Sequence, residues 1–183
     1  MYPVSDGFLR ALKSNTRKYY WTGTIVTRGG MTYEFGAKEI VKGSGYISRQ
    51  CCGSTEIELG TVYAAEMGIT LLSDIDRYTL EDAQVTLVFH LVLADGSVED
   101  VPMGIFEVSE ANRLAKCLEL KAYDFMLRFD KSFNGFETVG TAYDFIALCC
   151  KRCKVEFANK RAEIDAMPNG GVTLSVYTEN DIE

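Results

Sequence analysis

The stretch VEDVPMGIFEVSEANRLAKCLELKAYDFMLRFD, which spans Val98–Asp130, says most about the fold of this 183-residue chain. Apolar and polar residues alternate through much of it, as they do in a β-strand with one buried face. Pro102 and Gly104 predict a corner between two strands, after which Phe106 points into the core. Asp124 is a residue type that begins a helix, here the apolar run FMLRF. The stretch therefore predicts strands that lead into a short helix.

The residues before this stretch read as further strands joined by tight turns. Aromatic and β-branched runs on either side of Gly29-Gly30 predict a hairpin, and Asp95-Gly96 predicts another after the long strand Gln84–Leu93. Shorter runs separated by glycines have the spacing of a barrel or sandwich. These runs are Glu39–Lys42, Tyr46–Gln50 and Ser54–Leu59.

Two short helices are expected among these strands. Ser5 or Asp6 can cap the first, whose apolar stripe includes Phe8 and lies against the domain. Thr61 can cap the second, VYAAEM, with Gly68 just after its last residue. The first domain is therefore predicted to be a β-barrel with short helices, of the mainly β (β+α) class.

The strand Gln84–Leu93 is apolar on both faces. Its odd positions are all apolar, so that face belongs in the core. A strand with two apolar faces lies at the centre of a sheet, or one of its faces meets another subunit. The even face is therefore the predicted subunit interface, and it consists of Thr86, Val88, His90 and Val92.

The composition changes after Asp130, and the next ten residues read as a connector. Thr141 with Asp144 resembles a capping box and opens the predicted helix Ala142–Cys153. Strands are expected at 155–157 and 172–177. We predict a domain at 1–132 and a small α/β segment at 133–183, which has too few residues for an independent core. The segment would dock on the first domain or be completed by a partner.

Few side chains suggest chemistry. His90 is the only histidine, which excludes a site that needs two imidazoles. Cys149, Cys150 and Cys153 contain a Cys-x-x-Cys spacing, but no second cysteine pair has the spacing of a zinc site, so they read as small core residues. No nucleophile motif or phosphate-binding loop is present. We predict no catalytic, cofactor or metal residue, and a protein that is not an enzyme.

The net charge and the N-terminal residues bear on binding to nucleic acid and on insertion into a membrane. The net charge of −7 opposes sequence-specific binding to nucleic acid, although it suits a conduit that lets DNA pass without gripping it. The first residues do not form a signal peptide, and no run of eighteen apolar residues predicts insertion into a membrane. The chain is therefore expected to be made in the cytoplasm with reduced thiols.

The order of these elements resembles the amino-terminal part of bacteriophage and prophage tail-hub proteins, the family of the baseplate hub and of tail-associated lysins. The similarity covers about Ser5–Phe133. Its most characteristic piece is the Pro-x-Gly-x-Phe-x-Val run that begins at Pro102, followed by Ala-Tyr-Asp and a helix. These motifs are patterns of hydrophobicity and turns rather than catalytic signatures.

The resemblance implies a tail-hub β-barrel that assembles as a ring, commonly a trimer, and joins the tail tube to a spike or fibre around a DNA channel. It implies the tail tube, the distal tail protein and the spike or fibre as partners, and a place in the virion tail after synthesis in the bacterial host. Two alternatives stay open: the anchoring module of a tail-associated cell-wall hydrolase, and a generic ligand-binding β-domain. Family members continue into a second barrel, so 133–183 is expected to be the start of a truncated one.

Overall fold

The computed structural model describes residues 2–50, 63–131 and 138–176. The chain separates into two compact units, Met1–Leu127 and Arg128–Glu183, and each is described by itself. The predicted strand Ser54–Leu59, the predicted cap Thr61 and the first residue of the predicted helix VYAAEM lie outside the described residues.

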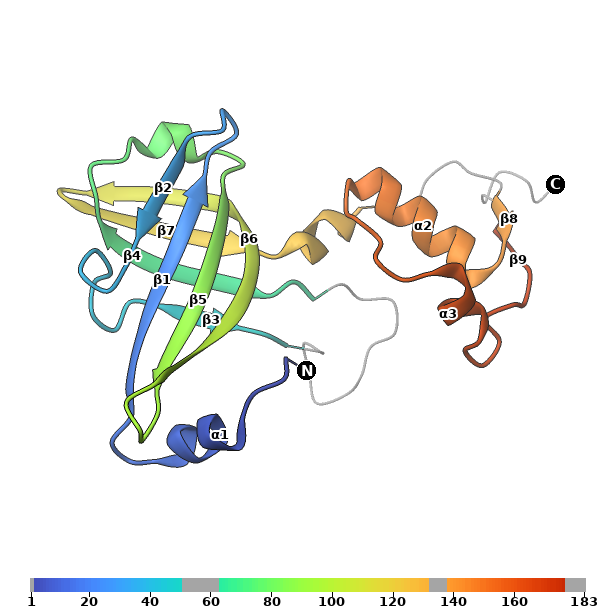
Figure 1. Ribbon diagram of the computed structural model, residues 1–183. Helices are drawn as coiled ribbons and strands as arrows, with labels where there is room; N and C mark the ends of the chain where they lie inside the picture. Colours follow the sequence, from blue (N-terminus) through green and yellow to red (C-terminus); the bar gives the residue numbers. More distant parts are fainter. Residues whose placement is uncertain (1, 51–62, 132–137, 177–183) are drawn as a thin grey trace. The chain divides into compact units, whose positions relative to one another are not determined.

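One antiparallel sheet of seven strands forms the first unit, in the order β2-β1-β5-β6-β7-β4-β3 (Figure 1). The mainly β prediction is therefore confirmed, and so are the hairpins that join β1 to β2 and β5 to β6. The strands are β1 (Lys18–Val26), β2 (Thr32–Phe35), β3 (Tyr46–Ser48), β4 (Glu66–Leu72), β5 (Gln84–Val92), β6 (Val98–Leu114) and β7 (Cys117–Tyr123).

The sheet does not close into the predicted barrel. Its edges are β2 and β3, and no pairing joins these two strands within the described ranges. The connection between them instead runs beside β4, where the Val41 N–H donates to the Thr70 carbonyl at 2.9 Å. Because a closed barrel has no edges, this difference leaves strand edges that a barrel would have covered.

β6 is one curved strand of 17 residues rather than two strands joined at a corner. Pro102 lies opposite Val88 and Gly104 lies opposite Leu87, so Met103 is the extra residue of a β-bulge. Pro102 has no N–H to offer the ladder, and Gly104 has a φ of +118° that side chains disfavour. The predicted corner is therefore a bulge, after which β6 continues to Leu114.

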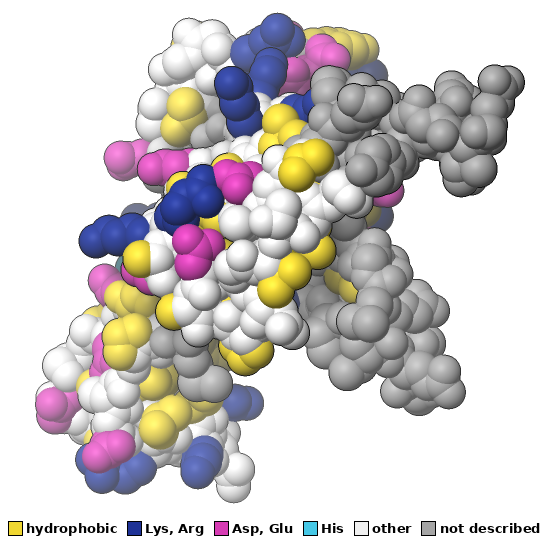
Figure 2. Space-filling view, turned by 90° about the vertical axis from the view of Figure 1, so that its right-hand side faces the viewer, with side chains coloured by type: hydrophobic (Ala, Val, Ile, Leu, Met, Phe, Trp, Pro, Cys, Tyr) yellow, Lys and Arg dark blue, Asp and Glu magenta, His cyan; other side chains and the backbone are white. Residues whose placement is uncertain are grey.

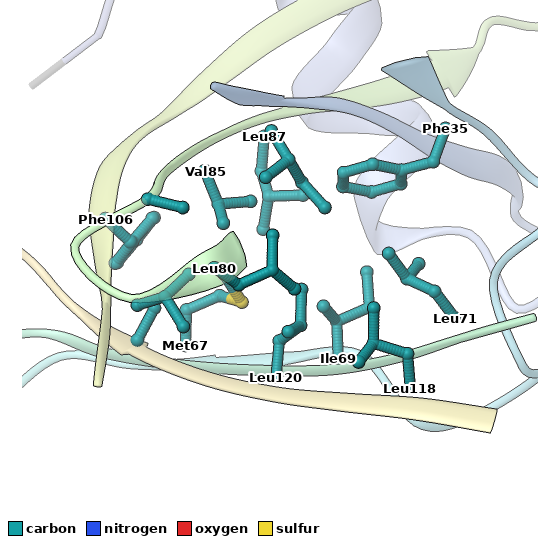
Figure 3. Packing of buried hydrophobic residues seen from close by; sticks show 14 of the residues in the cluster. Phe35, Met67, Ile69, Leu71, Leu80, Val85, Leu87, Phe106, Leu118 and Leu120 are labelled. Atoms are coloured by element: carbon teal, nitrogen blue, oxygen red, sulfur yellow. The ribbon is translucent and has the colours of Figure 1, made fainter. Parts of the chain in front are cut away.

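The core lies between the two halves of the curved sheet (Figure 3). Val85 and Leu87 of β5 point toward Leu118 and Leu120 of β7 across it. Phe106 is 1% exposed, which confirms its predicted inward direction. One further core residue, Leu80, comes from the 3₁₀ helix η1 (Arg77–Leu80).

The helix α1 (Asp6–Lys13) forms as predicted, with Ser5 as its N-cap. The Phe8 N–H donates to the Ser5 hydroxyl at 3.0 Å, and the Phe8 ring packs edge-on against Phe89. The prediction of a second helix is wrong for its described residues, because Glu66 and Met67 belong to β4. Their pairing with β7 supplies hydrogen bonds and burial that a single isolated helical turn lacks.

Asp124 caps a 3₁₀ helix, η2 (Phe125–Phe129), by accepting the Met126 N–H at 3.0 Å. The predicted cap is therefore confirmed. Met126 and Leu127 are 45% and 43% exposed, and η2 contains no buried residue. The boundary between the two units falls within η2, between Leu127 and Arg128.

The second unit contains β8 (Thr138–Gly140), α2 (Ala142–Cys153), α3 (Arg161–Asp165) and β9 (Leu174–Val176). The predicted helix and its capping box are confirmed, because the Thr141 N–H donates to Asp144 at 2.9 Å. The Arg161 guanidinium pairs with the same carboxylate and holds the pKa of Asp144 well below its ordinary value. The predicted strand at 155–157 is absent, whereas β9 lies within the strand predicted at 172–177.

Phe106→Ala is expected to lower the free energy of unfolding by about 3–5 kcal/mol, because it leaves a cavity where a fully buried ring stood. Ile105→Ala is the matched control, since the Ile105 side chain is 46% exposed, and it should cost less than about 1 kcal/mol. Urea unfolding of the two variants measures the difference, and equal losses would contradict the assignment of the faces of β6.

Candidate functional site

The residues predicted to meet another subunit lie together on the outer face of the sheet. Thr86, Val88, His90 and Val92 alternate with the buried Val85, Leu87 and Leu91, and each is partly exposed. Their neighbours on β1 and β6 add apolar side chains that are 38–46% exposed, and these are Tyr20, Val26, Val98 and Ile105. We call these eight residues the outer face. Its role as an interface stays a prediction.

His90 is the centre of a hydrogen-bonded chain that crosses three strands. Its Nδ1 lies 2.6 Å from Asp100 Oδ1 on β6, and its Nε2 lies 2.7 Å from Thr22 Oγ1 on β1. The Tyr20 ring stacks on the imidazole with a centroid distance of 4.5 Å. An ionised carboxylate only accepts hydrogen bonds, so Nδ1 carries the proton and Nε2 of the neutral ring accepts from the Thr22 hydroxyl.

A hydroxyl, an imidazole and a carboxylate in this order also form the nucleophilic site of serine hydrolases. Here the groove of about 530 Å³ beside Thr22 is lined by the carboxylates Glu34 and Glu39. One N–H of the groove, that of Gly36, is already bonded to Glu39 Oε2 at 2.9 Å. An oxyanion needs free N–H donors rather than carboxylates. The geometry therefore favours a structural role, in which these hydrogen bonds hold three strands together, over a nucleophilic site.

Sequence reasoning missed Thr22 and Asp100 as partners of His90. The signal for Asp100 was the hairpin at Asp95-Gly96, because strands joined by a hairpin must pair. The Leu93 N–H donates to the Ser97 carbonyl at 2.8 Å, which makes a three-residue loop and sets His90 opposite Asp100. Thr22 comes from a strand about 70 residues earlier, and no local signal indicates it.

The four residues of the predicted corner do not form one site. Pro102 and Gly104 are exposed at the bulge, Phe106 is in the core, and Asp124 begins η2. Their roles in the described structure are those of backbone geometry, packing and capping.

A cavity of about 580 Å³ opens between β1 and the β3–β4 edge of the sheet. The inward side chains of β1 become more exposed toward this opening, from Ile25 at 0% to Tyr19 at 57%. Trp21 and Tyr19 pack on the Phe89 ring, with centroid distances of 5.2 and 5.5 Å. Within the described ranges, the cavity is therefore an uncovered part of the core, with aromatic walls.

Apolar residues of five segments line the interior of the cavity, and basic residues lie at its rim. The interior residues are Trp21, Ile40, Ile47, Ile69 and Leu87, and the basic ones are Arg17, Lys18 and Lys42. Among the described lining residues none is acidic, although the whole chain carries a net charge of −7. The cavity thus combines apolar walls with a local positive charge.

Tyr46 of β3 lines the opening of the cavity and is hydrogen-bonded to a charged neighbour. Its hydroxyl donates to Glu66 Oε1 at 2.5 Å, and Glu66 Oε2 lies 3.3 Å from Lys121 Nζ. The hydrogen bond raises the pKa of Tyr46 and, as the largest cause, lowers the pKa of Glu66. These contacts fix the ring position at the edge strand.

The cysteines of α2 lie in the second unit. Cys150 and Cys153 are buried, Cys149 is partly exposed, and burial raises the pKa of the Cys150 thiol. In the parts of the chain that the structure describes, no three His, Cys, Asp or Glu side chains are grouped to hold a metal ion, and no helix is long and apolar enough to cross a membrane. The choice between packing and zinc stays a prediction for metal analysis.

Comparisons with known proteins find a distant likeness among solved structures. No family model matches the sequence, and no curated protein matches it. Among solved structures, a chain of one named "Virion of native gene transfer agent (GTA) particle" is 12% identical, with a TM-score of 0.47. The alignment covers 91% of this chain and 56% of that chain, so the chain spans about half the length of this structural neighbour.

The protonation of His90 is open to direct measurement, because the chain has a single histidine. With Asp100 ionised, the neutral ring should carry its proton on Nδ1 rather than on Nε2. A ¹⁵N–¹H correlation spectrum of the imidazole shows the tautomer, and Asp100→Leu should shift the proton to Nε2. A proton on Nε2 in the unmodified protein would contradict this hydrogen-bond chain.

The Tyr46–Glu66 contact predicts a pH dependence of stability. The lowered pKa of Glu66 contributes stability that is present above its ordinary pKa of 4.5 and is lost as the pH falls through the folded value. The raised pKa of Tyr46 contributes stability that is present below 10.0 and is lost as the pH rises through the folded value.

Tyr46→Phe should therefore lower Tm most between pH 4.5 and pH 10.0. The difference in Tm between the variant and the unmodified protein should shrink toward lower and higher pH. Thermal unfolding across pH measures it. A Tm difference that does not vary with pH would contradict the electrostatic origin.

Proposed function

We propose that this chain is a structural component of a phage, prophage or phage-derived tail, and that it acts without catalysis at the hub or baseplate. In this role it joins the tail tube to a spike or fibre around a channel for DNA. The resemblance of Ser5–Phe133 to tail-hub proteins supports the class. The structural observation that carries the proposal is the outer face of β1, β5 and β6, with its exposed apolar side chains.

The outer face has the composition of a surface that another protein covers. Val88, Val92 and Ile105 contribute apolar area on adjacent strands, and contiguous apolar area of this kind marks interaction sites. The polar groups among them already bond to one another, since His90 is held by Thr22 and Asp100. Burial of the outer face would therefore leave few polar groups without partners, and such groups are what make burial costly.

The charge of the chain supports a part that surrounds DNA without holding it. Figure 2 shows acidic and basic side chains in small groups among hydrophobic and other side chains. The net charge of −7 repels phosphate at long range. A channel lined by such subunits would let DNA pass.

A ligand-binding β-domain is the second candidate, and the cavity beside β1 favours it. Its volume of about 580 Å³ lies within the range of small-molecule sites. This function predicts saturable binding by a monomer, whereas the tail role predicts assembly. Clearing of peptidoglycan by the purified chain would instead overturn the proposal that it is not an enzyme.

Ile105→Glu is expected to weaken self-association at least about tenfold, because it places a charge in the proposed interface. Leu114→Glu is the matched control: it makes the same kind of change on the same strand, at a side chain that is 76% exposed beside the β6–β7 turn. Sedimentation velocity over a range of concentrations measures both. A tail role is contradicted if the unmodified chain stays monomeric throughout and fails to bind tail-tube protein.

A further inference from the structure

We propose that β1 binds an extended acidic and apolar segment of a partner protein, which adds to the sheet as a strand along Lys18–Thr22. The alternate apolar side chains of the segment would fill the cavity beside β1. The site lies along the edge of β1 that faces β2, whereas most of the outer face lies on β5 and β6. The inference does not depend on a role in a tail.

The first step concerns the backbone of β1. β5 pairs with β1 from Lys18 to Val26, whereas β2 pairs with it only from Gly23 to Val26. On the side of β2, Lys18–Thr22 thus has no strand partner in the described part of the chain. Every second residue of this free edge directs its N–H and C=O outward, which is the arrangement that strand addition uses. Five residues give a site about 16 Å long.

The second step concerns the space beside the free edge. The cavity begins at Lys18–Trp21 and extends to Ile47 and Ile69 on the other edge of the sheet. A strand that pairs with β1 places alternate side chains in this space and the others in solvent. Apolar side chains at alternate positions would cover Trp21 and Tyr19, and Tyr19 is now 57% exposed.

The third step concerns charge, which selects the chemistry of the partner. Arg17, Lys18 and Lys42 line the cavity, and the lining residues that are described include no carboxylate. Arg17 and Lys18 lie where β1 begins, so an antiparallel segment would bring its carboxyl end to them. That end is expected to carry Asp or Glu, because opposite charges favour both the orientation and the rate of binding.

A designed peptide tests the proposal: acetyl-VTVTVDE-amide, labelled with fluorescein and titrated with the complete chain. Binding should be saturable, and hydrogen exchange should show that amides of Lys18–Thr22 on the free edge become protected. The peptide VTVTVKK, which has lysines in place of Asp and Glu, tests the contribution of the acidic carboxyl end. VTPPVDE tests the ladder, because two adjacent prolines remove an N–H directed at β1 in either register.

Lys18→Glu/Lys42→Glu in the protein should weaken binding of the acidic peptide by about tenfold or more. Lys116→Glu, at the exposed turn between β6 and β7, is the control and should leave binding unchanged. Circular dichroism and Tm confirm that each variant is folded before its affinity is compared.

Four results of the binding experiments would overturn the proposal. They are no binding of the acidic peptide at millimolar concentration, equal binding of the proline peptide, equal binding by the double variant, and binding of an apolar dye such as anilinonaphthalene sulfonate without binding of the peptide. Protection of the Lys18–Thr22 amides that rises with protein concentration in the absence of peptide would also overturn it, because the occupant would then be a second copy of the chain.

Discussion

The pairing of β5 with β1 on one side and with β6 on the other is the interaction on which the rest of the first unit depends. It gives the sheet a buried face, from which Val85 and Leu87 reach the core, and an outer face centred on His90. β1 is paired with β5 along all of its nine residues but with β2 along only four. Among the residues that the structure describes, that difference in length leaves both a free strand edge and an uncovered part of the core.

Sequence patterns predicted what depends on neighbours along the chain. Alternation placed Phe106 in the core, and turn residues located the hairpins. The prediction of a closed barrel was wrong because closure requires two distant sheet edges to pair. Whether they meet depends on the lengths of the strands. The corner at Pro102 was wrong for a related reason, since one extra residue within a continuous ladder has the same local signal as a turn between two strands.

The candidate sites were less accessible to prediction than the fold. The even face of β5 could be named from its composition, whereas the partners of His90 depend on register. A two-residue loop after β5 would have set Val101 opposite His90, but the observed three-residue loop sets Asp100 there. The cavity could not be predicted at all, because it depends on how far β2 pairs along β1 rather than on any motif in the sequence.

In the proposed function, the protein works through the outer face and the free edge of β1, and its polar groups hold strands together. The central claim is that copies of the chain assemble through the outer face into a ring. Native mass spectrometry of the purified chain tests it most directly. We predict a discrete closed species, with three times the 20.4 kDa mass of one chain favoured. A single 20.4 kDa species at every concentration would contradict the claim.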